Sequence, residues 1–369
     1  MLISLFTGVL MPAKASEHES DAQQSKAIDP KAIIFEHLGD GYGWEVPFNH
    51  HKRIPLPVIV YGTDGFHCFS SSRVAHGATY VDGGVEFKIA GEDSPYKGKV
   101  VEIVDGKEVK PFDISITKNV MAAFITVFVV IGLIMWLARY YRKHPDFKAP
   151  RKGLGAIEVV VSFVYDGVIK STLGPQARRF APYLLSVFFF ILTMNLLGLI
   201  VIFPGGANLT GNIGVTLVLA ICTFLMTNLF GTKHYWKEIF WPDVPIWLKC
   251  PIPIMQVIEV FGMFTKPAAL TVRLFANMMG GHMIVIVLTL LIFIFAAMSP
   301  AIGAATSVVS ILFSVFMLVI DVLVSFIQAY VFTMLSTIFI SLAQEHGHEE
   351  AAHKDETKET TAAAVAATK

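Results

Sequence analysis

The sequence predicts an all-α polytopic membrane protein with about five spanning helices, preceded by a small β-containing domain. Three observations lead to this prediction. Of the 369 residues, 54% are hydrophobic and only 16% are charged, whereas soluble proteins carry about 25% charged residues. The apolar residues gather in blocks of about 20, the length that crosses a bilayer. Before the first block lies a polar segment with short strand-like runs.

Residues 1–15 have the pattern of a secretory signal sequence. An apolar run from Leu2 to Leu10 leads to Ala13-Lys14-Ala15, which fits an A-x-A cleavage site. The basic residue that usually precedes such a run is missing. Cleavage after Ala15 is therefore expected, and an uncleaved polar N-terminus stays open as the alternative.

Residues 16–115 are polar and punctuated by Gly and Pro, and we expect a small β-containing domain outside the bilayer. The run Val58–Tyr61 is continuously apolar and β-branched, and the run Val85–Ile89 alternates. Asp82-Gly83-Gly84 and Asp105-Gly106 stand next to such runs and are turn signals.

No metal site, cofactor or nucleic-acid partner is predicted. Four histidines of the polar segment lack ligand-like spacing, which favours surface histidines over a metal site; they are His50, His51, His67 and His76. Three cysteines are far apart, which predicts unpaired thiols; they are Cys68, Cys222 and Cys250. The 29 basic and 29 acidic residues balance, which argues against nucleic acid.

The first spanning helix is expected at Met121–Leu137. Six basic residues follow it between positions 139 and 152, which predicts that this loop is cytoplasmic and the preceding domain periplasmic. The segment Leu154–Leu173 is too polar to span and is expected to lie as a helix on the cytoplasmic surface.

The second and third spans are expected at Ala181–Phe203 and Val215–Phe230. The loop between them, Pro204–Asn212, carries no Lys or Arg, as periplasmic loops do. The segment Trp236–Pro253 that follows is rich in Trp and Pro, and its tryptophans suit the membrane interface.

Two long apolar stretches complete the predicted membrane domain, which covers residues 116–345. They are Ile254–Met298 and Ala301–Leu342. Each exceeds the length of a straight crossing, which implies tilt or a protruding end. The remaining segment, 346–369, is charged and then rich in Ala and Thr, and we expect a disordered cytoplasmic tail.

Ionisable residues inside these two stretches are functional candidates, because burying a charge in lipid costs at least about 2.5–3.5 kcal/mol. Glu259, Lys266 and Arg273 are spaced by seven residues, which places them on one helix face. Asn277 lies close to that face, and His282 falls near the opposite one.

The turn between the two stretches, at Ser299-Pro300-Ala301, sets which residues lie at the same depth in an antiparallel hairpin. Arg273 and Gln328 are about equally far from the turn, and so are His282 and Asp321. At 1.5 Å per residue, the His–Asp level lies roughly 10–14 Å nearer the periplasm than the Arg–Gln level. A proton path needs such an arrangement, with a titratable pair towards one aqueous side and a permanent cation deeper in the membrane.

Structural explanations remain open for part of this pattern. Serine stripes in membrane helices also mark close helix packing. For Ser307, Ser310 and Ser314, this packing explanation is as good as a role in a channel. A structural ion pair is an alternative for His282 and Asp321. Neither explains Arg273, because no carboxylate of this chain is predicted at its depth and a buried charge needs a partner or water. We therefore expect its partner on another subunit.

These residues resemble the signature of one family. The segment from Glu259 to His282 contains Lys266-Pro267 and the run Arg273-Leu274-Phe275-Ala276-Asn277-Met278-Met279-Gly280-Gly281-His282, and it is similar to subunit a of rotary ATP synthases. Three further segments fit: Asn195-x-x-Gly198-Leu199, Asn212-x3-Thr216 and Gln328-Ala329-Tyr330-Val331-Phe332. The resemblance covers residues 116–345 and leaves the periplasmic domain without a role.

The resemblance implies a proton-translocating stator subunit in a bacterial inner membrane, in contact with lipid, the ring of c subunits, the b-subunit stalk and the remaining ATP synthase subunits. Arg273 would face the ring and favour proton release from each passing carboxylate, since a guanidinium stays charged. Gln328 would hold its orientation, while His282 and Asp321 would form the periplasmic relay. Glu259 would lie nearer the cytoplasmic exit.

Two other function classes compete with this interpretation. Secondary transporters commonly show inverted repeats and broken helices, and no repeat is visible here. A structural scaffold would leave Arg273 unexplained. The sequence also lacks a Gly-rich phosphate loop, so we do not expect the chain to make ATP by itself. The choice between proton and sodium coupling stays open.

Overall fold

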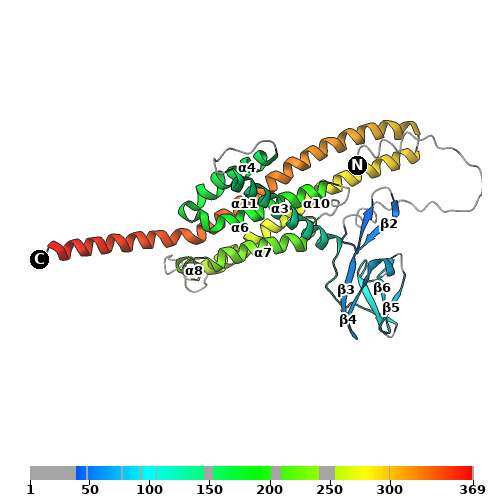
Figure 1. Ribbon diagram of the computed structural model, residues 1–369, viewed down its shortest axis with the longest axis horizontal. Helices are drawn as coiled ribbons and strands as arrows, with labels where there is room; N and C mark the ends of the chain where they lie inside the picture. The colour runs from blue at the N-terminus through cyan, green and yellow to red at the C-terminus, as the bar shows by residue number, and fades with distance from the viewer. Residues whose placement is uncertain are drawn as a thin grey trace, which may run out of the picture. The chain divides into compact units, whose positions relative to one another are not determined.

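The computed structural model describes residues 39–46, 49–75, 78–91, 94–104, 106–144, 153–200, 209–240, 254–298 and 300–367. Strands occupy its N-terminal part and helices the rest (Figure 1). The predicted signal sequence, His76, Cys250, most of the predicted loop Pro204–Asn212, and Trp241 and Trp247 lie outside the described residues.

The chain divides into two compact units, each assembled from separate stretches. The first consists of Met1–Phe128, Met194–Leu209 and Met278–Val324. The second consists of Val129–Thr193, Thr210–Asn277 and Ser325–Lys369.

Short antiparallel strands build the N-terminal domain, which confirms its predicted β content. They are β1 (Gly43–Val46), β2 (Asn49–Pro55), β3 (Pro57–Gly62), β4 (Gly65–Ser70), β5 (Tyr80–Asp82), β6 (Val85–Ile89), β7 (Val100–Val104), β8 (Lys107–Val109) and β9 (Phe112–Asp113). They form the sheets β1-β2, β4-β3-β9 and β5-β6-β7-β8. The periplasmic location of this domain stays a prediction.

A shared hydrophobic core joins the three-stranded and four-stranded sheets. Val58 and Val60 of β3 lie in one buried cluster with Phe87 of β6 and Val100 of β7. The predicted turn at Gly83-Gly84 connects β5 to β6, with φ angles of 63° and 93°. Glycine suits this turn because both central positions have positive φ, which other residues rarely adopt.

His67 corrects the prediction of surface histidines. Its side chain is buried, because the alternation of β4 turns it and Phe69 towards the core while Phe66 and Cys68 face outwards. Its Nδ1 lies 3.0 Å from Oδ2 of Asp82, and its ring packs against Phe87. Within the described residues, no group of three or more metal-ligating side chains gathers.

The helices follow the strands along the chain. They are α3 (Lys118–Lys143), α4 (Gly153–Val164), the π-helix η3 (Tyr165–Lys170), α5 (Ser171–Leu173), the 3₁₀ turn η4 (Gly174–Gln176), α6 (Ala177–Leu199), α7 (Ile213–Leu229), α8 (Lys233–Phe240), α10 (Ile254–Met298) and α11 (Pro300–Ala367). Among the described residues, four helical stretches are long and apolar enough to cross a membrane, and α7 is a shorter apolar helix of 17 residues. A polytopic helical membrane protein is thus confirmed.

The segment predicted as a surface helix is helical from Gly153 to Leu173, through α4, η3 and α5. The backbone leaves the helical conformation at Gly174, whose φ is 51°, and the 3₁₀ turn η4 leads into α6. Together, Gly153–Leu199 is long and apolar enough to cross a membrane. Helix α11 extends to Ala367, through the segment 346–369 for which a disordered tail is expected. Ala, Glu and Lys are frequent in that segment and are strong helix formers; the disordered tail stays a prediction.

Apolar and small polar side chains build the core of the second unit. Its buried cluster includes Phe180, Leu184 and Phe188 of α6 together with Leu274 of α10 and Phe332 of α11. Hydroxyl groups bridge the helices inside this core. The Tyr183 hydroxyl lies 3.1 Å from Oγ1 of Thr223, which lies 3.4 Å from Oγ of Ser336. Small hydroxyl residues are typical of close helix packing in membranes.

Candidate functional site

Arg273 lies on α10 and points away from the helical core. Its neighbours Leu270 and Leu274 are buried in the core of the second unit, while the Arg273 side chain itself is exposed. Among the residues that the structure describes, none forms an ion pair with it. The helix thus presents a permanent cation on its outer surface.

Helix α10 exposes large apolar side chains, both next to Arg273 and on its other sides. Val272, adjacent to it, is 57% exposed, and the preceding turns of α10 expose further large hydrophobic side chains. These are Val257, Ile258, Phe261 and Phe264. Asn277, one turn after Arg273, is exposed as well. Exposed large apolar side chains on several sides of α10 are typical of a helix that meets lipid or apolar protein rather than water.

Gln328, predicted at the depth of Arg273, lies on α11 and is buried. Its Nε2 has no hydrogen-bond partner in the described part of the chain. The residues that follow the two predicted partners, Leu274 and Ala329, belong to one hydrophobic cluster. Both helices thus contribute to the same core next to these two positions, but the structure contains no hydrogen bond that joins Arg273 to Gln328.

Asp321 and Gly281 are in direct contact in the first unit. An ideal Cβ at Gly281 would lie 2.6 Å from Oδ1 of Asp321 and 3.1 Å from its Cγ. The Asp321 carboxylate therefore lies against the backbone of α10, one residue before His282. This contact agrees with the depth predicted for His282 and Asp321.

The His282 side chain is partly buried. Its Nε2 is enclosed and makes no hydrogen bond to any described residue. The Lys118 ammonium at the start of α3 is near enough to act on His282 electrostatically. Ser307, from the serine stripe, donates to the Gly303 carbonyl of its own helix at 2.8 Å, and Ser310 is buried. Both observations favour the packing explanation for these two serines.

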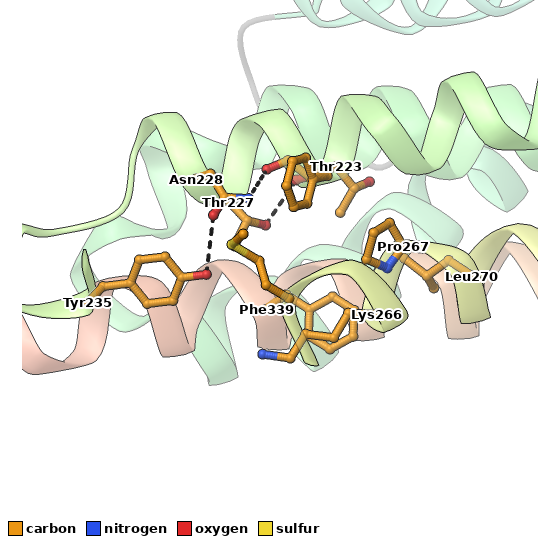
Figure 2. Close-up of a pocket in the computed structure, with 10 residues that line it drawn as sticks. Thr223, Thr227, Asn228, Tyr235, Lys266, Pro267, Leu270 and Phe339 are labelled. Carbon is orange, nitrogen blue, oxygen red and sulfur yellow. Dashed lines mark hydrogen bonds between the residues drawn. The ribbon is translucent and has the colours of Figure 1, made fainter. Parts of the chain in front are cut away.

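A small pocket in the second unit collects polar groups from α7, α8 and α10. Figure 2 shows Tyr235 directed towards Asn228 and Lys266 beside Phe339. The Tyr235 hydroxyl donates to Oδ1 of Asn228 at 3.4 Å, and the Lys266 ammonium lies 5.6 Å from the centre of the Phe339 ring. Thr223, Thr227 and Pro267 also line the pocket.

Two groups at this pocket affect its chemistry. Burial raises the pKa of Tyr235, and the negative charge of Glu259 raises it further. Glu259 is thus close enough to influence the phenol.

Pro267 cannot donate a backbone hydrogen bond, which leaves the Met263 carbonyl without its helical donor. The sequence analysis singled out Glu259 and Lys266 but missed Tyr235 and Asn228, because a Tyr in a short helix carries no distinguishing pattern.

Comparison with known proteins identifies the family. The profile described as ATP synthase A chain matches residues 120–341, which is most of the helical region. The chain belongs to the ATP synthase subunit a family. Membership of this family links the chain to ATP synthesis and ion transport. Its apolar helices indicate a membrane protein.

Individual relatives show the same likeness. ATP synthase subunit a of Chlorobium phaeobacteroides is 39% identical over 249 residues, which cover 66% of this chain and 69% of the relative. ATP synthase subunit a 2 of Prosthecochloris aestuarii is 41% identical over 253 residues, 66% of this chain and 73% of the relative. ATP synthase subunit a of Myxococcus xanthus is 40% identical over 252 residues, 65% and 77% respectively.

The β strands fall under a second match. Residues 33–119 correspond to a domain of unknown function, DUF8433. The two matches meet inside the first turn of α3. The subunit a likeness thus covers the helices and assigns no role to the strands.

Proposed function

We propose that this chain is the proton-translocating stator subunit of a rotary F-type ATP synthase, with two aqueous half-channels and with Arg273 as the group that drives proton exchange on the c-ring. It would lie in a bacterial inner membrane, with the β domain in the periplasm and the C-terminus in the cytoplasm. Its protein partners would be the c-ring, the b-subunit stalk and the remaining subunits of the complex.

The exposed position of Arg273 is the observation that carries this proposal. A guanidinium on an apolar membrane surface, without an ion pair in the described part of the chain, is costly unless a partner supplies a negative charge. A ring whose subunits each bring one carboxylate past this face supplies that charge repeatedly. Because Arg stays protonated at physiological pH, each carboxylate that arrives is favoured in its ionised form and gives up its proton.

The two half-channels follow from the groups on either side of Arg273 along α10. His282, with Asp321 against Gly281, lies about 13 Å from Arg273 in one direction. Glu259, whose charge acts on Tyr235, lies about 21 Å away along the helix in the other direction. Protonatable groups on both sides of a permanent cation let protons enter at one surface and leave at the other without passing the cation.

Replacement of Arg273 tests the proposal. Arg273→Ala should abolish proton-driven ATP synthesis in membrane vesicles while the complex still assembles, as judged by the retained ATP synthase subunits. Arg273→Lys should also fail, because an ammonium loses its charge more readily when desolvated and lacks the planar fork. The matched control is Arg178→Ala, which removes an exposed arginine at the start of α6 and should leave synthesis unchanged. Normal synthesis by Arg273→Ala would refute the mechanism.

A further inference from the structure

The N-terminal domain carries an exposed aromatic face that the proposed function does not use. Tyr61 of β3 lies directly opposite Phe66 of β4 and Phe112 of β9. Directly opposite residues project to the same side of a sheet. The three side chains are 59%, 66% and 70% exposed, respectively, so the row is open across all three strands.

A second row lies beside the first. Ile59 is paired with Cys68, and the amide of Ile114 donates to the Ile59 carbonyl at 2.9 Å. Cys68 is exposed and Ile114 is 57% exposed. The aromatic face therefore consists of six positions, none of them charged: Ile59, Tyr61, Phe66, Cys68, Phe112 and Ile114. The opposite side of the same strands buries Val58, Val60 and Phe69 in the domain core, so the exposed side chains are not needed to complete that core.

The aromatic face is fixed next to the first spanning helix. Only residues 114–117 separate β9 from α3, a reach of about 13 Å at 3.3 Å per residue. Sheet-like pairing continues through this link, since the Ile116 amide donates to the Pro57 carbonyl at 3.2 Å. At the start of α3, the Lys118 amide donates to the Gly41 carbonyl at 2.9 Å. The domain is thus hydrogen-bonded to the helix end and not merely tethered to it.

Exposed apolar side chains continue from the sheet into the helix. After Phe112 and Ile114, the next large exposed side chains along the chain are Val120 and Phe124 of α3, at 40% and 53%. A lysine precedes Phe112 and another follows Ile114, at positions 110 and 118. Aromatic side chains bounded by lysine are typical of the boundary between headgroups and acyl chains, where Tyr and Lys keep their polar ends in water.

From this geometry we infer that the aromatic face rests on the phospholipid surface at the end of α3. It binds the headgroup–acyl boundary and holds the domain against the membrane, with Tyr61, Phe66 and Phe112 as the inserted side chains. The four-stranded sheet then faces away from the lipid, because the shared core lies between it and the aromatic face.

Cys68 offers a direct test, since it lies within the face. In the assembled complex, Cys222→Ser and Cys250→Ser leave Cys68 as the single thiol of this chain, which an environment-sensitive nitrobenzoxadiazole label then marks. The matched control carries Cys68→Ser and Glu86→Cys in addition; Glu86 is exposed on β6 of the other sheet. Both are placed in phosphatidylcholine–phosphatidylglycerol vesicles, with nitroxide on the lipid near the headgroup or with aqueous iodide as the quencher.

The label at Cys68 should emit at shorter wavelength than the label at position 86, lose most of its emission to the nitroxide lipid and resist iodide. The label at position 86 should do the reverse. Adding Phe66→Asp and Phe112→Asp should abolish the lipid quenching at Cys68, since charge opposes insertion. Quenching of the Cys68 label by iodide as strong as at position 86 would overturn the inference, because the face would then be open to water. Protection from both quenchers would overturn it as well, because protein would then cover the face.

Discussion

The carboxylate of Asp321 occupies the space that a side chain at Gly281 would need, with Oδ1 only 2.6 Å from an ideal Cβ position. Gly280, its neighbour on the same helix, has open space at the corresponding point. The absence of a side chain at 281 thus lets Asp321 approach α10 next to His282. Two adjacent glycines in the family-like motif therefore have different physical roles.

The first prediction compares these two glycines. Gly281→Ala should displace the Asp321 carboxylate, because crowding of this kind costs about 1–3 kcal/mol, and ATP-driven proton pumping should fall roughly tenfold. Gly280→Ala adds the same methyl group to the same helix without a clash and should pump normally. The measurement is acidification of inverted vesicles that hold equal amounts of assembled complex.

A second substitution separates crowding from loss of the carboxylate. In an Asp321→Ala background, the Gly281→Ala change has no carboxylate to displace and should cause no further loss of pumping. If Gly281→Ala lowers pumping by the same factor in both backgrounds, helix distortion rather than contact with Asp321 explains its effect.

Tyr42 supports the next prediction, which concerns the β domain. Its hydroxyl donates to Oδ2 of Asp113 at 2.5 Å and accepts from the Val100 amide at 3.2 Å. Tyr42→Phe removes both bonds and leaves a buried amide without its acceptor, which should cost about 1–3 kcal/mol of local stability. Faster hydrogen exchange in a peptide that covers β7, measured by mass spectrometry on the full chain, would report this loss. An unchanged exchange rate would contradict it.

The same side chain predicts a dependence on alkaline pH. Burial raises the pKa of Tyr42 above its ordinary value, and the hydrogen bond to Asp113 raises it further. A group whose pKa is raised by folding contributes stability below its unfolded pKa, about 10 for Tyr, and this contribution is lost as pH rises through the folded value. Protection of β7 should therefore weaken above about pH 10 in the unmodified chain. The Tyr42→Phe variant should lack this component.

Orientation in the membrane gives a third prediction. A cysteine introduced at Lys148, in the basic segment after α3, should react with impermeant reagents only from the cytoplasmic side, since basic loops stay inside. A cysteine at Ala207, in a loop without Lys or Arg, should react only from the periplasm. Each variant serves as the control for the other, and the reverse pattern would exchange the two half-channels.

The membrane helices and the hairpin register could be predicted from the sequence, because both depend on local patterns. Long apolar runs delimit α10 and α11, and the turn at Pro300 fixes which residues face each other, as the contact of Asp321 with Gly281 illustrates. The pattern is strong here because a charge in lipid is costly enough to stand out.

Other features depend on tertiary contacts and left no local signal. Tyr235 lines the pocket only because α8 packs near Glu259 and Asn228. His67 is buried because two sheets share a core, whereas the sequence shows only a histidine in a polar domain. Nothing in the sequence around Tyr61 and Phe112 indicates that the two side chains lie in one exposed row, since strand pairing over long separations creates it.

The last prediction concerns His282 and Asp321 as a functional pair. If they share a proton-relay site, they exchange protons with each other and titrate together rather than independently. His282→Ala should then lower proton flux strongly without stopping it, because water still reaches the ring, whereas Arg273→Ala eliminates coupling.

Exchange of the two residues provides the decisive comparison. The double variant His282→Asp with Asp321→His keeps one carboxylate and one imidazole at the same depth, so it should pump more than either single change. Each single change instead leaves two like groups, and a charge on one of them disfavours the charged form of the other. The placement of Gly281 supports the exchange, since it leaves room for the residue at position 321 on the α10 side. ATP-driven pumping in inverted vesicles gives the readout for all three variants. A double variant no better than the worse single one would show that the two positions are not paired, and the relay would then have to run through His282 or Asp321 alone.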